Sequence, residues 1–155
     1  MAVTFADTPT VETKRVYYEG SDTLQEGYAL CYNFNYGTAS AADTARLMRV
    51  EKPATANLEY FAGVVHPDSA GKTGPCYVTI IVPSVQGEAA NVHTDQNCTL
   101  GTTELAAQDG SYALGAAGAG APAVAKALQT VDRSVTNGLV FARLGAWTAI
   151  FNNTA

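Results

Sequence analysis

The sequence predicts an all-β fold, a small single-domain β-barrel or sandwich with an extended N-terminal arm. Apolar segments of strand length occupy residues 58–65, 76–82 and 139–144, and Pro, Gly, Asp or Asn residues bound them. Turn residues also separate several shorter β-branched and aromatic pieces, as in small barrels and sandwiches. The 155 residues suffice for one core and are few for two. We therefore expect an arm over residues 1–10 and a single β domain over 11–155.

The first strands are predicted from changes in composition. Residues 1–10 have no sustained hydrophobic period, whereas β-branched and aromatic residues accumulate over 11–20, before a turn at Gly20-Ser21-Asp22. In the next segment, YALCYNF over 28–34, strand geometry puts alternate residues on opposite faces. Residues 36–43 are small and polar and predict a loop, and the strand after it ends at Pro53.

The central segments predict the most regular strands. LEYFAGVV over 58–65 is continuously apolar, which is typical of a strand buried on both faces. CYVTIIV over 76–82, stopped by Pro83, is the clearest strand in the sequence. Shorter strands are expected at 90–94, 111–115 and 138–144.

The segment APAVAKALQTVD, residues 121–132, is compatible with either a helix or a strand. Ala, Lys, Leu and Gln favour a helix, and Val124, Leu128 and Val131 would share one of its faces. The Gly-rich residues before it are a poor start for a helix, and a turn at Asn137-Gly138 leads into another strand. We predict a strand.

Composition narrows the possible partners. Charged residues are 15% of the chain, hydrophobic residues 47%, and the net charge is −5. An acidic protein with a pI of about 4.8 lacks the positive surface that nucleic acid and anionic membranes require. No apolar segment approaches the ~20 residues of a membrane span, and the first residues do not resemble a signal peptide. We expect synthesis in a cytoplasm, and no nucleic-acid or membrane partner.

The cysteines and the short motifs predict no active site. Cys31, Cys76 and Cys98 are odd in number and are expected to be free, with Cys98 the most exposed. Gly71-Lys72-Thr73 resembles the end of a phosphate-binding loop, but the upstream glycine is missing and Gly74-Pro75 prevents the following helix. The two H-x-D pairs, at His66 and His93, lack the dense ligand spacing of a metal site. We expect a protein that is not an enzyme and uses no cofactor and no metal.

The order of these features resembles the head-decoration, or capsid cement, proteins of tailed bacteriophages. The features are an arm with few charged residues, Glu19-Gly20 to Gly27, FAGVV, GPCYVTIIVP, Asp95 to Gly101-Thr102, and a closing GLVFARL. The resemblance implies a structural protein, often trimeric, on the outer surface of the expanded capsid, where it clamps subunits of the major capsid protein. The alternatives are another virion β-domain, for tail or fibre attachment, or a carbohydrate-binding module. A sugar-binding module would use exposed aromatic residues, for which the candidates are Tyr17, Tyr18, Tyr32, Tyr36 and Tyr60.

The expected interface lies at the two ends of the domain. Val3 and Phe5 would face the same side of an extended arm, which suits addition of a strand to a coat-protein sheet. The last ten residues, AWTAIFNNTA, contain no ionisable side chain, and they either complete the core or cover a neighbouring subunit. The residues expected at the capsid or subunit interface are Val3, Phe5, Val11, Trp147, Ile150 and Phe151.

Overall fold

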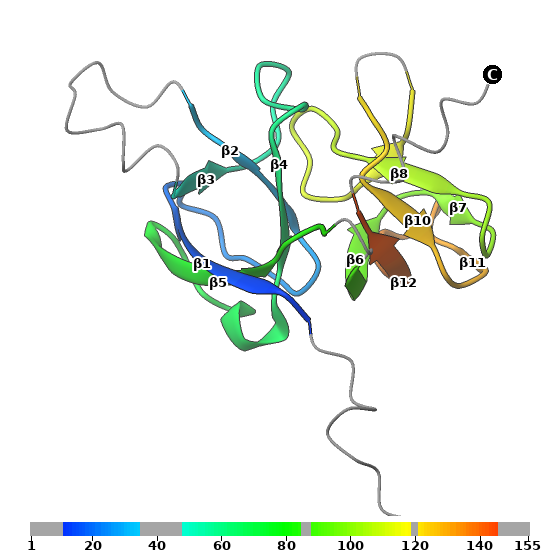
Figure 1. The fold of residues 1–155 in the computed structure, drawn as a ribbon, viewed down its shortest axis with the longest axis horizontal. Helices are drawn as coiled ribbons and strands as arrows, with labels where there is room; N and C mark the ends of the chain where they lie inside the picture. Colours follow the sequence, from blue (N-terminus) through cyan, green and yellow to red (C-terminus); the bar gives the residue numbers. More distant parts are fainter. Residues whose placement is uncertain (1–10, 35–47, 85–87, 119–120, 146–155) are drawn as a thin grey trace, which may run out of the picture.

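The computed structural model describes residues 11–34, 48–84, 88–118 and 121–145, and the predicted all-β fold is confirmed. The described strands form a closed five-stranded barrel, a five-stranded sheet and a two-stranded ribbon (Figure 1). The predictions for the N-terminal arm, for the loop over 36–43 and for the C-terminal segment fall on residues outside the described ranges.

The barrel is formed by the first half of the chain. Its strand order is β1-β3-β2-β4-β5, and β5 pairs again with β1 to close it. The pair β1–β3 is parallel, and the other four pairs are antiparallel. A single-turn 3-10 helix, η2 (Pro67–Ser69), lies between the last two strands. The barrel strands are β1 (Thr13–Tyr18), β2 (Ala29–Tyr32), β3 (Arg49–Glu51), β4 (Phe61–Val65) and β5 (Cys76–Ile81).

The second sheet has the order β6-β12-β10-β8-β9, and the ribbon pairs β11 with β7. The segment 121–132 contributes two strands, β10 and β11, so the prediction of strand over helix is confirmed. The strands of the sheet are β6 (Glu88–Thr94), β8 (Glu104–Ala106), β9 (Gly115–Ala116), β10 (Ala125–Ala127) and β12 (Gly138–Leu144). Those of the ribbon are β7 (Asn97–Cys98) and β11 (Val131–Asp132).

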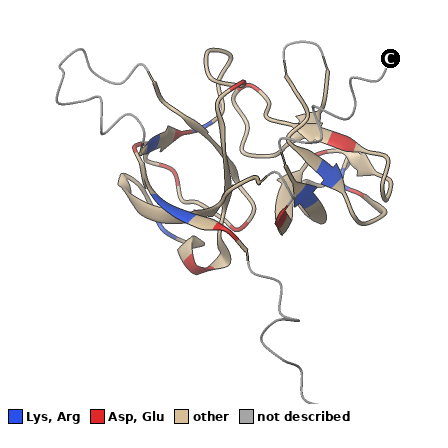
Figure 2. Ribbon diagram, in the orientation of Figure 1, with Lys and Arg blue, Asp and Glu red and all other residues tan. Residues whose placement is uncertain are grey.

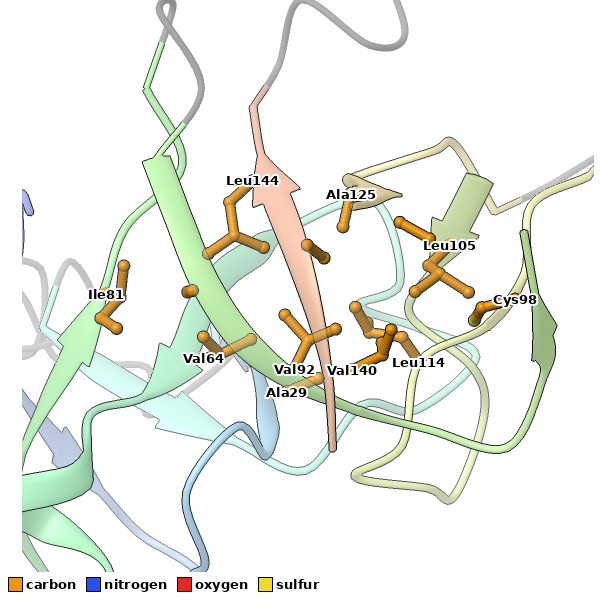
Figure 3. Close-up of a cluster of buried hydrophobic side chains, with 13 residues drawn as sticks. Ala29, Val64, Ile81, Val92, Cys98, Leu105, Leu114, Ala125, Val140 and Leu144 are labelled. Atoms are coloured by element: carbon orange, nitrogen blue, oxygen red, sulfur yellow. The ribbon is translucent and has the colours of Figure 1, made fainter. Parts of the chain in front are cut away.

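Two cores divide the apolar residues, and β4 contributes to both. Val65 belongs to the core inside the barrel, whereas its neighbour Val64 belongs to a second core. Alternation along β2 and β5 splits Ala29 from Leu30 and Ile81 from Ile80 in the same way. In the second core these outer residues of the barrel pack with residues of the second sheet, so we call it the shared core (Figure 3). The predicted burial of β4 on both faces is confirmed.

Glycine is required where the barrel wall comes close to other backbone. A Cβ at Gly63, in β4, would lie 2.2 Å from the carbonyl oxygen of Ile81, and the residue has a φ of +153°. Gly27 has a φ of +79°, and its carbonyl oxygen accepts a hydrogen bond of 2.9 Å from the backbone N–H of His93 in β6. Side chains at either position would be strained or would push the two backbones apart.

The three cysteines are free. Cys31 and Cys98 are buried and Cys76 is half-buried, so the expectation that Cys98 is the most exposed is wrong. Pairing of β7 with β11 places Cys98 opposite Val131 and buries its side chain in the shared core. Burial raises the pKa of the Cys31 thiol to about 12, with Glu51 adding to the shift, and burial is also the largest cause of the raised pKa of Cys98. Both thiols therefore remain protonated and unreactive at neutral pH.

Candidate interaction surface

Arginine and tyrosine side chains form a continuous patch on the outer wall of the barrel. Tyr17 of β1 lies directly opposite Tyr77 of β5, with ring centroids 5.1 Å apart and an interplanar angle of 70°. The guanidinium of Arg15 lies 4.8 Å from the centroid of Tyr77, and that of Arg49 lies 4.9 Å from the centroid of Tyr17. We call these four residues the Arg–Tyr band. Figure 2 shows the basic residues on β1 and β3 of the barrel.

The band follows from strand geometry. Val16 and Tyr18 point into the barrel core, so the alternate residues Arg15 and Tyr17 point outward. The register of β1 against β5 then sets Tyr17 opposite Tyr77. Cation–π and aromatic pairs fix these side chains in place before any partner binds.

A polar groove of about 660 Å³ adjoins the band at the mouth of the barrel. Tyr17 and Arg49 of the band form part of its lining, together with acidic and basic side chains of the loops. Glu19 links the band to the groove. Its carboxylate lies 3.5 Å from the guanidinium of Arg49, in the band, and accepts a hydrogen bond of 2.5 Å from the amide of Asn33, in the groove lining. The groove and the band are therefore one connected surface.

Tyr112 closes the groove from the side of the second sheet. Its hydroxyl donates a 2.7 Å hydrogen bond to Asp22 and is also hydrogen-bonded to the hydroxyl of Tyr18. Its ring stacks on Tyr28 with a centroid distance of 4.7 Å, and the ammonium of Lys52 lies 4.8 Å from its centroid. Burial, followed by the hydrogen bonds to Tyr18 and Asp22, raises the pKa of Tyr112, so this hydroxyl stays protonated and can donate.

A second aromatic group lies at the ends of β2 and β4. Phe34 stacks on Tyr32 at a centroid distance of 5.7 Å and meets Tyr60 edge-on at 4.8 Å. Phe34 and Tyr60 are 37% and 39% exposed. The ammonium of Lys14, on β1, lies 3.3 Å from the Tyr32 hydroxyl. This group repeats the chemistry of the band, with tyrosine rings beside a basic residue.

The acidic side chains of this surface make hydrogen bonds and ion pairs with neighbouring residues, which fix their positions. Besides the contacts of Glu19 and Asp22, the carboxylate of Glu51 accepts a 2.7 Å hydrogen bond from the Asn57 amide. Within the described ranges, no three or more His, Cys, Asp or Glu side chains are grouped so that they could hold a metal ion. The arrangement suits recognition of another surface, since donors, rings and charges are fixed in advance.

The short motifs of the sequence have structural roles here. His66 caps η2, because its Nδ1 atom accepts a 3.1 Å hydrogen bond from the backbone N–H of Asp68. Lys72, in the segment between η2 and β5, donates a 3.3 Å hydrogen bond to the carbonyl oxygen of Tyr77 in β5. None of the helices in the described part of the chain is long and apolar enough to cross a membrane.

The predicted interface residues are mostly outside the described ranges. Of the six, the structure describes Val11, which is half-buried against the shared core. Among the tyrosines considered for sugar binding, Tyr18 is buried inside the barrel, where its ring cannot reach a ligand surface. Tyr17, Tyr32 and Tyr60 lie on the surface described above, and Tyr36 is outside the described residues.

The residues of this surface that sequence reasoning missed include Arg15, Arg49, Tyr77 and Tyr112. The alternation of β1 was a usable signal for Arg15, which shares a face with Tyr17. Tyr112 is distant from the barrel in sequence and reaches it through the loop before β9, so no local pattern marks it.

Comparisons of the chain with models of protein families, with curated proteins and with solved structures found no match.

Proposed function

We propose that the protein decorates and stabilises the outside of an expanded phage capsid by clamping adjacent subunits of the major capsid protein. The Arg–Tyr band is the observation that supports this role best. Tyrosine and arginine are, with tryptophan, enriched at the energetic centres of protein interfaces. Tyr77 is 48% exposed although its ring is large and apolar. Burial of this ring against a partner surface would therefore lower the free energy of the complex.

The band and the N-terminal arm are adjacent along the chain. β1 begins at Thr13, so residues 1–10 lead directly into the strand that carries Arg15 and Tyr17. In the proposed complex, Val3 and Phe5 add the arm to a coat-protein sheet while the band contacts the neighbouring subunit. β1 would connect the contact made by the arm with the contact made by the band. One copy of the protein could therefore bind two coat subunits at the same time.

Charge distribution indicates which coat surface the band would fit. Four of the nine basic residues, Lys14, Arg15, Arg49 and Lys52, lie on or beside β1 and β3, and the acidic residues Glu12, Glu19 and Glu51 accompany them. A coat-protein surface with both acidic and basic groups would complement this mixed charge, with a carboxylate opposite the exposed Arg15, and would orient the approach. Copies of the chain would form a trimer on the capsid through their weakly charged surfaces.

The band favours a protein partner over a sugar. Guanidinium groups lie over the rings of Tyr17 and Tyr77, and they compete with a sugar for the ring faces on which it would stack. A virion β-domain for tail or fibre attachment would use the same band. The two functions are distinguished by whether the protein binds expanded capsids or binds tails and fibres.

Co-sedimentation with undecorated expanded capsids tests the proposal. Tyr77→Ala should weaken binding by about tenfold or more, which corresponds to ~1.4 kcal/mol or more at an interface centre. Phe141→Ala is the matched control, because Phe141 is 43% exposed but lies on β12 of the second sheet. Deletion of residues 2–10 should also reduce binding while leaving thermal unfolding nearly unchanged.

Two results would contradict the proposal. The first is failure of the wild-type protein to bind expanded capsids while it binds tails, fibres or a glycan array. The second is equal capsid binding by the Tyr77→Ala, deletion and wild-type proteins.

A further inference from the structure

A small polar pocket lies at the junction between the barrel and the second sheet. Its volume is about 230 Å³, and it adjoins the groove of the candidate surface, with which it shares Lys52 and Tyr112. Tyr28 and Lys52 line it from the barrel half of the chain, and His93, Ser111 and Tyr112 from the second half. Pockets between two packed units are common sites for small ligands.

Lys52 gives this pocket a positive charge. The described residues that line the pocket include Lys52 but no acidic residue. The ammonium of Lys52 lies 4.8 Å from the centroid of the Tyr112 ring, which holds it at the pocket wall. In the part of the chain that the structure describes, no carboxylate lies within about 4 Å of this ammonium, the distance of an ion pair. A cleft lined by charge of one sign attracts ions of the other sign.

Two acidic residues adjoin the pocket lining in sequence, and each of them accepts a hydrogen bond from another residue. Glu51, next to Lys52, accepts a 2.7 Å hydrogen bond from the amide of Asn57. Asp109 accepts a 2.8 Å hydrogen bond from the backbone N–H of Thr55. These contacts hold both carboxylates outside the lining, so neither neutralises the pocket.

Neutral groups complete the lining. The hydroxyl oxygen of Ser111 accepts a 3.1 Å hydrogen bond from the backbone N–H of Ala113, so its own O–H can donate to a ligand. Asn137 is exposed and adds an amide donor. Burial, and secondly the charge of Arg133, lower the pKa of His93, so this ring is neutral at pH 7. The pocket therefore combines one full positive charge with neutral hydrogen-bond donors.

We propose that this pocket binds a small organic carboxylate, with the carboxylate beside Lys52. The single charge of a carboxylate matches one ammonium, whereas a phosphate group carries about −1.5 to −2 at pH 7. Hydrogen bonds between a carboxylate and an ammonium are stronger than those between neutral groups. The size fits an acid of a few carbon atoms, because a cavity of ~150 Å³ in another protein holds a benzene ring. The inference is independent of the proposed capsid function.

Titration of the full chain with sodium acetate, followed by NMR, tests the proposal without any capsid. Sodium chloride holds the ionic strength constant, so that general salt effects cancel. The backbone amide resonances of Ser111 and Tyr112 should shift and reach saturation, whereas that of Gly101, which is outside the lining, should not shift.

Lysine variants test the source of the affinity. Lys52→Gln should weaken acetate binding by about tenfold or more, because it removes the charged donor. Lys52→Arg keeps the charge and should retain binding. Lys72→Gln is the matched control, since Lys72 is exposed and does not line the pocket, and it should leave the affinity unchanged.

Lys52→Gln also removes the ammonium from the Tyr112 ring, so Asn137→Ala provides a second variant at an exposed position of the same pocket. It should weaken acetate binding several-fold, and circular dichroism verifies that each variant is folded. The proposal is overturned if the shifts grow without saturation, or if both folded pocket variants bind acetate as the wild type does. It is also overturned if inorganic phosphate binds more tightly than acetate, because the pocket would then select a higher charge.

Discussion

The barrel core and the shared core are built from different side chains. Among their buried residues, alanine accounts for five of thirteen in the shared core and for one of nine in the barrel core. The largest side chains of the barrel core are Tyr18, Leu24, Leu30 and Ile80. A closed barrel has a fixed interior that large side chains must fill.

The shared core has a different geometric requirement. Three alanines, Ala127, Ala142 and Ala90, lie in register across β10, β12 and β6. All three are buried in the shared core, to which outer residues of the barrel such as Val64 also belong. Small side chains let the sheet approach the barrel closely. The comparison teaches that the barrel is sensitive to loss of volume and the shared core to gain of volume.

Loss of volume in the barrel should have the largest effect. Leu30→Ala removes a fully buried side chain and should lower the free energy of unfolding by about 2–5 kcal/mol. Urea unfolding followed by circular dichroism measures the change. Leu100→Ala, at a residue that is 57% exposed, is the control and should stay within about 0.5 kcal/mol of wild type. Equal losses in the two variants would mean that the barrel interior is not closely packed.

Gain of volume in the shared core should have the second-largest effect on stability. Ala142→Leu inserts a large side chain in the middle of the alanine row and should cost about 1–3 kcal/mol. Ala116→Leu is the matched control, because Ala116 is exposed on β9. Thermal unfolding should show a lower midpoint for Ala142→Leu than for this control. An unchanged or higher midpoint would show that the shared core contains unused space.

The fold class was predictable because its signals are local. The continuous apolar segment at β4 indicated burial on both faces, and Gly-rich residues before 121–132 argued against a helix. The division into barrel and sheet was not predictable, because it depends on pairing between distant segments, such as the parallel pair β1–β3. Burial of Cys98 depends on the same kind of pairing, with β11.

The candidate surface was predictable only in part. Tyr17 was a candidate from its residue type, whereas its contacts with Tyr77 and Arg49 require the strand register. Arg49 reaches the band through the parallel pairing of β3 with β1, which no sequence spacing encodes. The capsid partner, the trimer and the role of the arm remain predictions.

The smallest expected effect is a dependence of folding stability on pH, caused by a histidine at the junction between the two cores. His93, in β6, lies edge-on to Tyr28 at a centroid distance of 5.1 Å, and its backbone bonds to Gly27 of the barrel. Its Nδ1 atom is buried and makes no hydrogen bond to any residue within the described ranges. Burial, and secondly the charge of Arg133, lower the pKa of His93 from its ordinary value near 6.5.

A lowered pKa of His93 fixes the sign of the effect on stability. Below pH 6.5 the unfolded chain binds a proton at His93 that the folded chain does not, so stability is full above pH 6.5 and falls as the pH drops towards the folded pKa. Urea unfolding at several pH values from 5 to 8 should show this loss for the wild type. His93→Gln, which removes the titrating group, should flatten the slope in that range. An unchanged slope in the variant would assign the pH dependence to other groups and leave the junction as insensitive to pH as the barrel interior.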